Sequence, residues 1–242
     1  MQSLDINIHK THLTNILLDI YKDSDLCKSL GFKGGTATMF FYSLPRFSVD
    51  LDFDLTSKFS PNSKELEIMI KKMTSLLQNK YTIKDQNVKF NTLFWAVSYA
   101  EGTRQIKVEV STRDQPFNNY DLEPFYGMTV KLSQIRDMIA HKMTAISDRK
   151  SLANRDLFDT HFFLSSKYAT DINYEIIKQK TGKTPDVFYK DLLSFLEKVD
   201  NKNLLDGLGE LIDEKQKYWV KSNLLKELTG LIERQIDLKT WS

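Results

Sequence analysis

The segment from position 49 to 55, Val-Asp-Leu-Asp-Phe-Asp-Leu, constrains the fold of this 242-residue chain more than any other part. Its apolar side chains alternate with aspartates, and successive side chains of a strand point to opposite faces, so Asp50, Asp52 and Asp54 share one face. Aspartate is poorly suited to strands, and carboxylates about 7 Å apart repel one another unless a positive charge neutralises them. The pattern therefore predicts a strand whose acidic face binds a divalent cation.

Mg²⁺ is the cation that suits such a face. It prefers oxygen ligands and completes its coordination shell with water and nucleotide phosphates, so we expect Asp50 and Asp52 to hold it. With two metal ions, one activates the attacking oxygen and the other stabilises the leaving pyrophosphate. The alternative is an edge strand with a solvated acidic face, because edge strands carry charges that block aggregation. Asp54 is either a further ligand or lies past the end of the sheet.

A glycine-rich turn precedes the acidic strand. Gly34-Gly35-Thr36 leads into a short helix, where glycines leave backbone N–H groups exposed and a helix N-terminus favours an anion. Arg46 and Ser48 stand just before the acids and can add a guanidinium and a hydroxyl to the same phosphate, although either can be an ordinary surface residue. The order of the two segments favours a phosphate-binding site beside a metal-binding strand.

The composition limits the class of protein. Apolar residues make up 41% of the chain, which is enough for a core, and the net charge of +2 does not by itself indicate a polyanionic partner. The single cysteine, Cys27, excludes an internal disulfide framework, and the histidines are not at metal-ligand spacing. The N-terminal segment lacks a signal-peptide pattern, and no apolar run approaches the roughly 18 residues of a membrane-spanning helix. We therefore expect a cytoplasmic protein without membrane partners.

Helical and strand periodicities alternate along the first half of the chain. Apolar spacing indicates helices over 8–30, with a break at Asp23-Ser24, and from Ser60-Pro61 to about 79. The pattern predicts two or three more strands, near 81–85, 88–99 and 104–111, the last with period-two alternation. After a polar connection from 112 to about 128 the pattern is helical to the end. This order predicts an α+β fold, with an α/β core over residues 1–125 and a helical domain over residues 126–242.

The helical half carries a lysine at an unusual place. Lys142 falls within an apolar stripe that includes Met138, Ile139 and Ile146. Burying an ammonium is costly unless it is paired, so we expect a carboxylate or a bound triphosphate beside it. The alternative is a lysine at the edge of the stripe that reaches water.

In the helix that follows, polar residues can likewise act in the site or only stabilise the fold. Asp156 can face a cleft, whereas Arg155 and Asp159 are spaced for an ion pair along the helix. Phe158, Phe162 and Phe163 are more typical of core than of a base-stacking platform, and His141 and His161 are assigned structural roles.

Glu109 is a candidate third metal ligand. In the expected strand 104–111 it points away from the apolar side chains, and Lys107 shares its face. A cross-strand charge pair explains Glu109 equally well.

Two motifs in this order resemble those of a known family. The run Gly34-Gly35-Thr36 followed by Arg46-x-Ser48-x-Asp50-x-Asp52-Phe53 is similar to the signature of the AbiEii/AbiGii toxin-like nucleotidyltransferases, a branch of the DNA polymerase β-like superfamily. Downstream, Lys142, Ala145, Arg149 and the run Arg155-Asp156-Leu157-Phe158-Asp159 resemble the family's Lys-x-x-Ala, Arg and Arg-Asp-x-x-Asp motif. The resemblance covers roughly residues 31–165, and its signature does not demand Asp54.

The resemblance implies a polymerase β-like nucleotidyltransferase core with a helical C-terminal part. Carried over residue by residue, Asp50 and Asp52 are metal ligands, and Lys142 and Asp156 are the remaining functional pair of the cleft. Gly35 and Thr36 contact phosphate, and we include their neighbours Gly34, Arg46 and Ser48 in the expected nucleotide site. Such an enzyme requires a nucleoside triphosphate (NTP) and Mg²⁺ or Mn²⁺.

The resemblance also implies the toxin of a bacterial toxin and antitoxin pair or of a phage-defence system, with a cognate antitoxin as partner. Some members of the family block translation by adding nucleotides to tRNA acceptor ends. The expected reaction is therefore transfer of a nucleoside monophosphate from an NTP to an RNA end, with tRNA as acceptor. The alternatives are nucleotidylylation of a protein and a non-catalytic nucleotide-binding module that acts through a partner.

Overall fold

Two units make up the fold, and their residues interleave along the chain. One contains Met1–Ser43, Phe47–Pro116 and Tyr120–Ser133, and the other contains Leu44–Arg46, Phe117–Asn119 and Gln134–Ser242. The computed structural model describes residues 4–57, 59, 63–148 and 152–239. The sheet-containing unit thus ends at Ser133, and two short segments from earlier in the chain belong to the helical unit.

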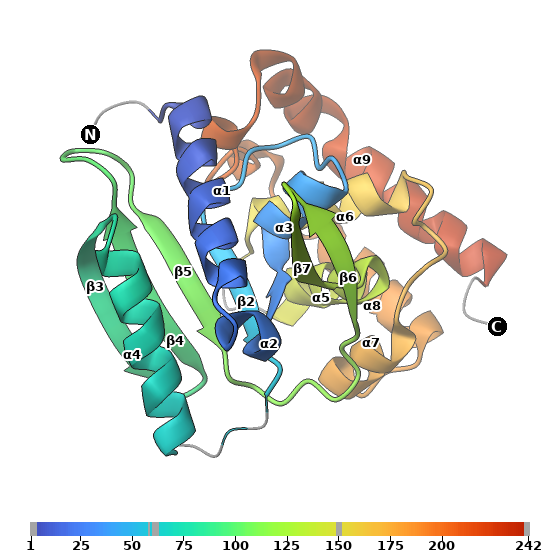
Figure 1. The fold of residues 1–242 in the computed structure, drawn as a ribbon. Helices are drawn as coiled ribbons and strands as arrows, with labels where there is room; N and C mark the ends of the chain where they lie inside the picture. Colours follow the sequence, from blue (N-terminus) through green and yellow to red (C-terminus); the bar gives the residue numbers. More distant parts are fainter. Residues whose placement is uncertain (1–3, 58, 60–62, 149–151, 240–242) are drawn as a thin grey trace. The chain divides into compact units, whose positions relative to one another are not determined.

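The first unit is built on a mixed sheet. Among the described residues this sheet has seven strands in the order β3-β4-β5-β2-β1-β7-β6 (Figure 1). The strands are β1 (Leu30–Lys33), β2 (Leu51–Leu55), β3 (Thr82–Lys89), β4 (Thr92–Ser98), β5 (Ile106–Ser111), β6 (Tyr120–Phe125) and β7 (Met128–Ser133). β2 runs antiparallel to β1 and parallel to β5, while β1 and β7 are parallel. The acidic strand β2 therefore lies inside the sheet, which rules out the edge-strand reading of its aspartates.

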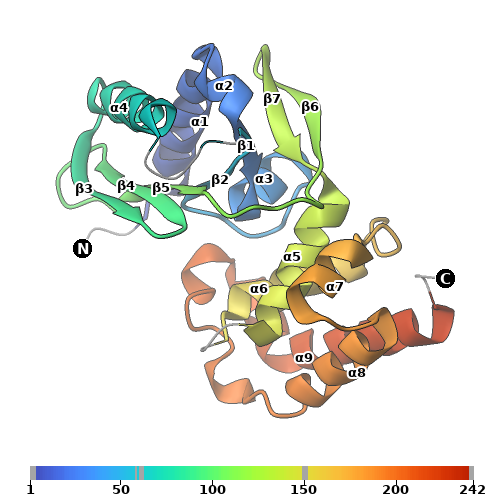
Figure 2. The same ribbon diagram turned by 90° about the horizontal axis from the view of Figure 1, so that it is seen from below.

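Helices cover the apolar face of this sheet. The helices of the unit are α1 (Ile6–Lys22), α2 (Leu26–Ser29), α3 (Gly34–Phe41) and α4 (Lys64–Gln78). α1 and α4 pack together on one side of the strands (Figure 2). Trp95 of β4 is buried and donates from Nε1 to Thr74 Oγ1 of α4 at 3.0 Å. Leu51 and Val108 are in register with Trp95, so the apolar side chains of β2 face these helices and its aspartates face the opposite side.

The helix boundaries follow local capping. The predicted break at Asp23-Ser24 is confirmed, because Asp23 Oδ1 accepts from the N–H groups of Asp25 and Leu26 at 3.0 Å each, where α2 begins. α4 begins at Lys64, and its N-cap Ser63 accepts from Leu66 N at 3.2 Å. The predicted helix start at Ser60-Pro61 lies outside the described part of the chain.

Three expectations about the strands are wrong. The sequence pattern predicts a helix up to Leu30 and a turn that begins at Gly31, but Leu30–Lys33 forms β1, because β2 and β7 pair with it on its two sides. The turn between β3 and β4 lies at Phe90-Asn91, after Lys89, so the expected strand over 88–99 begins too early. The expected connection and the start of the helical region instead contain β6 and β7, and β6 carries Pro124, a residue that sheets confine to edge strands.

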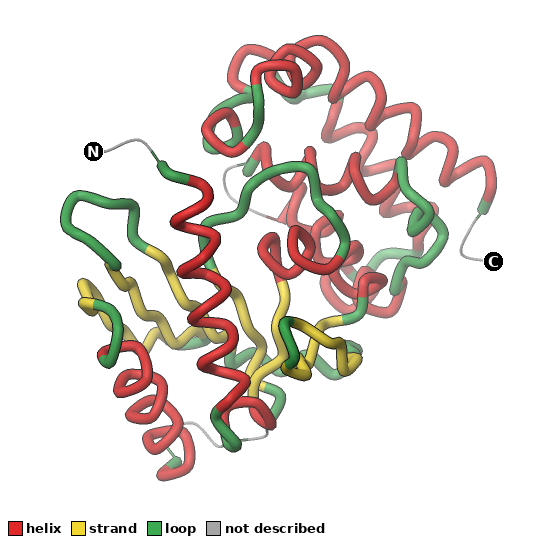
Figure 3. Tube along the Cα trace, turned by 45° about the horizontal axis from the view of Figure 1, so that its top comes forward, coloured by secondary structure: helices red, strands yellow, loops and turns green. Residues whose placement is uncertain are grey.

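The second unit is helical (Figure 3). Its elements are α5 (Ile135–Asp148), α6 (Asn154–Leu164), α7 (Tyr174–Thr181), α8 (Pro185–Leu196), the short 3₁₀ helices η1 (Asn201–Asn203) and η2 (Gly209–Leu211), and α9 (Glu214–Leu238). α6 packs against α5 and α9, and α8 packs against α9. A capping box between Asp213 and Gln216 starts α9. Within the described ranges, no helix combines the length and apolar character that a membrane crossing needs.

Candidate active site

The middle of the sheet gathers three carboxylates on one face. Asp52 of β2 is in register with Glu109 of β5 on one side and with Lys33 of β1 on the other. Neighbouring residues in register point to the same face, so these side chains form a row across the strands. Asp50 lies two positions before Asp52 and just ahead of β2. All three acids are partly exposed, so ligands can reach them.

Three protein groups fix Asp50 and the residue before it. The buried His9 of α1 donates from Nε2 to the carbonyl oxygen of Val49 at 2.9 Å, and Thr36 donates from its hydroxyl to the carbonyl oxygen of Asp50. The backbone N–H of Lys107 donates to Asp50 Oδ1 at 3.2 Å. Burial lowers the pKa of His9, so this histidine holds Val49 as a neutral ring. The backbone at Val49 and Asp50 is therefore held from α1 and α3, and the carboxylate of Asp50 is held from β5.

Gly34 packs directly against the carboxylate of Asp52. Gly34 has φ +81, and a Cβ built on it would lie 2.5 Å from Asp52 Oδ2. Both the backbone conformation and the space therefore require glycine. The Gly-Gly start of α3 and the central acid of β2 are thus in contact.

Asp54 is neutralised by the protein itself. Its Oδ1 forms an ion pair with Lys33, and its Oδ2 accepts from the hydroxyl of Tyr120 at 2.8 Å. Its side chain is 2% exposed, whereas that of Lys33 is 24% exposed. Asp54 pairs with Gly31 and Ser111 on the two neighbouring strands. It therefore lies neither past the end of the sheet nor among the acids that a metal ion can reach.

The donor chemistry fits a hard divalent cation. Asp50 and Asp52 supply partly exposed carboxylate oxygens. Because residue 34 is a glycine, no side chain at that position blocks the Asp52 carboxylate. Within the described ranges, no group of three or more Asp, Glu, His or Cys side chains is placed so that it could bind one metal ion. Two protein carboxylates with water and phosphate oxygens make up the kind of shell that Mg²⁺ accepts.

The other residues expected to bind the nucleotide have different surroundings. Gly35 and Thr36 are buried in the first turn of α3, and Ser48 is buried ahead of β2. Arg46 belongs to the helical unit, where it donates from Nε and Nη2 to Asp159 at 2.6 and 2.7 Å. The guanidinium expected at a phosphate is thus engaged in a buried ion pair.

The downstream motif forms a buried cluster of charges in the second unit. Lys142 of α5 contacts Asp156 Oδ1 at 3.0 Å and Asp159 Oδ2 at 2.8 Å. Together with Arg46 this gives two cations and two carboxylates in contact. The expected carboxylate partner of Lys142 is confirmed, and its side chain is 18% exposed. Arg149, part of the motif in the sequence, lies outside the described residues.

The charges of this cluster stabilise one another. Burial raises the pKa of Asp159, but Arg46 and Lys142 outweigh burial and lower it to about 2. Burial lowers the pKa of Lys142, but Asp159 and Asp156 outweigh burial and raise it above its usual value. Asp159 and Lys142 are therefore both charged at neutral pH.

The other side chains of α6 that the sequence singled out are an aspartate, two phenylalanines and a histidine. Asp159 bonds to Arg46 and Lys142 rather than to Arg155. Phe163 is fully buried, as expected of a core residue, and Phe158 is 4% exposed. His161 lies 3.0 Å from Glu227 through Nε2.

Lys33, Tyr120 and the Arg46–Asp159 pair are the polar groups that the sequence did not reveal. Lys33 stands in a segment that reads as a turn, and Tyr120 is 66 positions from Asp54. The only sequence signal was the excess acid, Asp54, which had to have a cation near it.

The first unit is thus a mixed sheet with flanking helices, in which the acids of β2 lie beside the Gly-Gly start of α3. The profile of one family, described as "Nucleotidyl transferase AbiEii toxin, Type IV TA system", matches residues 15–219. The chain belongs to this family of AbiEii nucleotidyltransferase toxins.

Two solved structures share the fold. One is a protein described as a nucleotidyltransferase from H. pylori, with a TM-score of 0.65 and 23% identity over 100% of this chain and 99% of that one. The other is JHP933 from Helicobacter pylori, with a TM-score of 0.64 and 22% identity over 100% of this chain and 97% of that one. No curated protein matches the sequence.

Proposed function

We propose that this protein transfers a nucleoside monophosphate from an NTP to the end of an RNA, with tRNA as acceptor. The observation that carries the proposal is that the aspartates at β2 have different surroundings. Asp54 is neutralised by Lys33 and Tyr120, while Asp50 and Asp52 remain partly exposed on the same face as Glu109. Family membership supports the reaction class, because nucleotidyl transfer from an NTP is what the family is named for.

In the proposed reaction a hydroxyl oxygen of the RNA bonds to the α-phosphorus of the NTP. The bond from that phosphorus to the bridging oxygen of pyrophosphate breaks, and the hydroxyl proton leaves to solvent. Asp50 and Asp52 would hold Mg²⁺, with Glu109 as a third carboxylate beside Asp52. The bound ion supplies charge stabilisation for the attacking oxygen and for the leaving pyrophosphate.

The start of α3 supports a phosphate site next to these acids. Its first N–H groups have no partner earlier in the helix, and the helix dipole favours an anion there. We propose that Gly34, Gly35 and Ser48 contact the triphosphate. Thr36 donates to the carbonyl of Asp50, so we propose that it positions Asp50 relative to the bound triphosphate.

Lys142 and Asp156 are the proposed functional pair of the helical unit. Their ion pair supports this. Moving an ammonium and two carboxylates out of water costs free energy of folding, so a role in function would explain why they are there. Arg46 has a structural part, because it completes the charge balance around Asp159. A cognate antitoxin is the proposed protein partner, on the ground of the toxin family alone.

Label transfer tests the proposal. Purified protein is incubated with Mg²⁺, total tRNA and each α-labelled NTP in turn, and the products are separated on a denaturing gel. We expect label on RNA with at least one NTP, and its loss with EDTA or in Asp50→Asn. Asp114→Asn, which changes an exposed aspartate away from β2, is the matched control and retains activity.

Three outcomes would contradict the proposal. Absence of label with all four NTPs would exclude the reaction, and full activity of Asp50→Asn would exclude the site. Label that migrates with a polypeptide instead of RNA would identify a protein acceptor.

A further inference from the structure

A cavity of about 330 Å³ lies within the second unit, between α6 and the first turns of α9. Phe158 and Phe162 of α6 and Trp219 of α9 line it, together with His161 and Lys215. Its volume is within the range of small-ligand sites. Phe162 and Trp219 are partly exposed, so aromatic surface is accessible inside it.

One carboxylate holds two of the rings that line the cavity, those of Trp219 and His161. Glu227 accepts from Trp219 Nε1 at 3.1 Å through Oε1 and lies 3.0 Å from His161 Nε2 through Oε2. The rings of Trp219 and His161 meet edge to face, with centroids 4.6 Å apart. Burial lowers the pKa of His161, which favours a neutral ring that donates to Glu227. The hydrogen bonds engage ring edges, so the orientation of the rings is set before any ligand binds.

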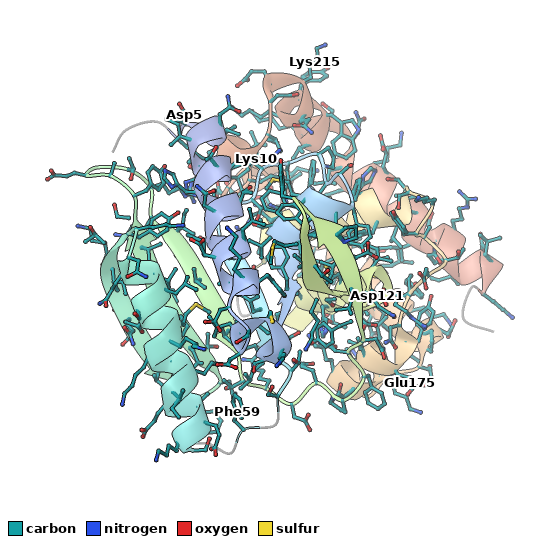
Figure 4. All side chains as sticks on the ribbon, viewed as in Figure 1. Asp5, Lys10, Phe59, Asp121, Glu175 and Lys215 are labelled. Carbon is teal, nitrogen blue, oxygen red and sulfur yellow. The ribbon has the colours of Figure 1, made fainter. Side chains whose placement is uncertain are left out.

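The charge at the cavity favours an anion next to a flat ring. Lys215 is exposed, and Figure 4 shows it projecting from the first turn of α9. None of the lining residues described for the cavity is acidic, and both oxygens of the nearby Glu227 carboxylate accept from Trp219 and His161. An aromatic surface with a cation at its edge is the combination that binds a nucleobase and its phosphate, and stacking accepts any base.

We propose that this cavity binds a nucleobase of the RNA acceptor, stacked on Phe162 and Trp219, with the adjacent phosphate at Lys215. The proposal rests on the proposed function for the identity of the acceptor. α6 also carries Asp156 and Asp159, so one helix bears both the charged motif and the wall of the base site. Through this cavity the helical unit would bind the RNA acceptor, and the binding would not depend on the base sequence of the RNA.

Direct binding tests the site without catalysis. The full chain is titrated in EDTA, without NTP, against a fluorescently labelled single-stranded oligoribonucleotide, and its anisotropy is followed. We expect Trp219→Leu and Phe162→Leu to weaken binding by about tenfold, because each removes one stacking face. Lys215→Gln should weaken binding and reduce its dependence on salt.

Lys221→Gln is the matched control. Lys221 is exposed on the same helix but does not line the cavity, so its variant should bind RNA within about twofold of wild type. Circular dichroism and thermal melting verify that each variant folds. Phe162→Leu and Lys215→Gln keep the test valid if Trp219→Leu does not fold, since neither residue is fully buried.

Photocrosslinking locates the bound base. RNA with 4-thiouridine should crosslink to the peptide that contains Phe162 or to the one that contains Trp219. Wild-type affinity in Phe162→Leu and Lys215→Gln, or crosslinks only elsewhere, would overturn the inference. Displacement of the oligonucleotide from the cavity by NTP alone would assign the site to the donor base and overturn it as well. RNA binding that depends on the cavity in a protein without transferase activity would support this inference while removing the proposed function.

Discussion

Lys33 and Asp54 form an ion pair inside the sheet of the first unit, and this pair separates the third acid of β2 from the other two. Asp54 also accepts from Tyr120, whose ring packs so closely on Gly31 that a Cβ there would lie 2.3 Å from it. One acid of the alternating segment is thus part of the sheet's own structure. The remaining two are those that we assign to the metal.

A double-variant cycle tests this assignment. Asp54→Asn leaves Lys33 without its ion-pair partner, and Lys33→Met leaves the buried Asp54 carboxylate without its cation, so each should lower the free energy of unfolding. We expect the double variant to be more stable than the sum of the two losses predicts, with a coupling of about 1–3 kcal/mol. Urea unfolding of the four proteins measures it. Additive losses would show that the two side chains do not interact.

Gly34 offers a test of the contact with Asp52. Gly34→Ala should lose about 1–3 kcal/mol of stability, because it meets both a positive φ and the Asp52 carboxylate. Gly127→Ala is the matched control, with φ +79 and no atom within 4 Å of the added Cβ. The alanine at 34 should therefore cost more than the alanine at 127, and it alone should reduce label transfer. Equal costs would contradict the close approach.

The Arg46–Asp159 pair should matter more than an ion pair at the surface. Arg46→Met leaves a fully buried carboxylate with one cation fewer, and we expect a loss of about 3–5 kcal/mol. Arg136→Met is the control in the same unit, because Arg136 and Asp171 are 46% and 54% exposed and 3.9 Å apart. That variant should lose less than about 1 kcal/mol. Chemical denaturation compares the two, and equal losses would contradict the role of the buried cluster.

Asp159 also predicts how stability depends on pH. Its pKa of about 2 in the folded protein lies below that of a free aspartate, so its contribution is present above about pH 4 and is lost as pH falls toward 2. The expected contribution is about 2 kcal/mol. Urea unfolding at pH 5 and at pH 2.5 measures the loss. Arg46→Met, which removes the larger cause of the lowered pKa, should lose less between these pH values than wild type.

Lys142 tests the functional role of the helical unit. Lys142→Met should reduce label transfer by at least about a hundredfold if the ammonium acts in the reaction, beyond its loss of stability. The matched variant Lys217→Met removes a lysine whose partner Glu214 is 87% exposed, and it should retain transfer. Wild-type transfer by a folded Lys142→Met protein would limit Lys142 to a structural part.

Local patterns predicted the elements nearest the acids, and long-range pairing explains what they missed. The alternation of Leu51 and Phe53 with aspartates identified β2, because it reflects a buried face against a polar one. β1 reads as a turn, since four residues with a glycine become a strand only when β2 and β7 lie on both sides. The hairpin of β6 and β7 was hidden by polar side chains and Pro124, which an edge strand tolerates.

The site was predictable to the same extent. The shared face of Asp50 and Asp52 follows from local alternation, whereas the pairing of β1 with β2 brings Gly34 against Asp52. The partners of Asp54 and Asp159 come from distant positions, since Arg46 and Asp159 are 113 positions apart, and no local rule joins them. The motif predicts Arg46 at a phosphate, whereas its ion pair with Asp159 could not be predicted from local sequence.

Locating the metal ion tests the central claim most directly. Crystals soaked with Mn²⁺ and a nonhydrolysable NTP would show the ion by its anomalous scattering. We predict a peak within coordination distance of carboxylate oxygens of both Asp50 and Asp52, with the triphosphate next to the first turn of α3. A peak at Asp54, or nucleotide bound without any metal ion at β2, would contradict this account.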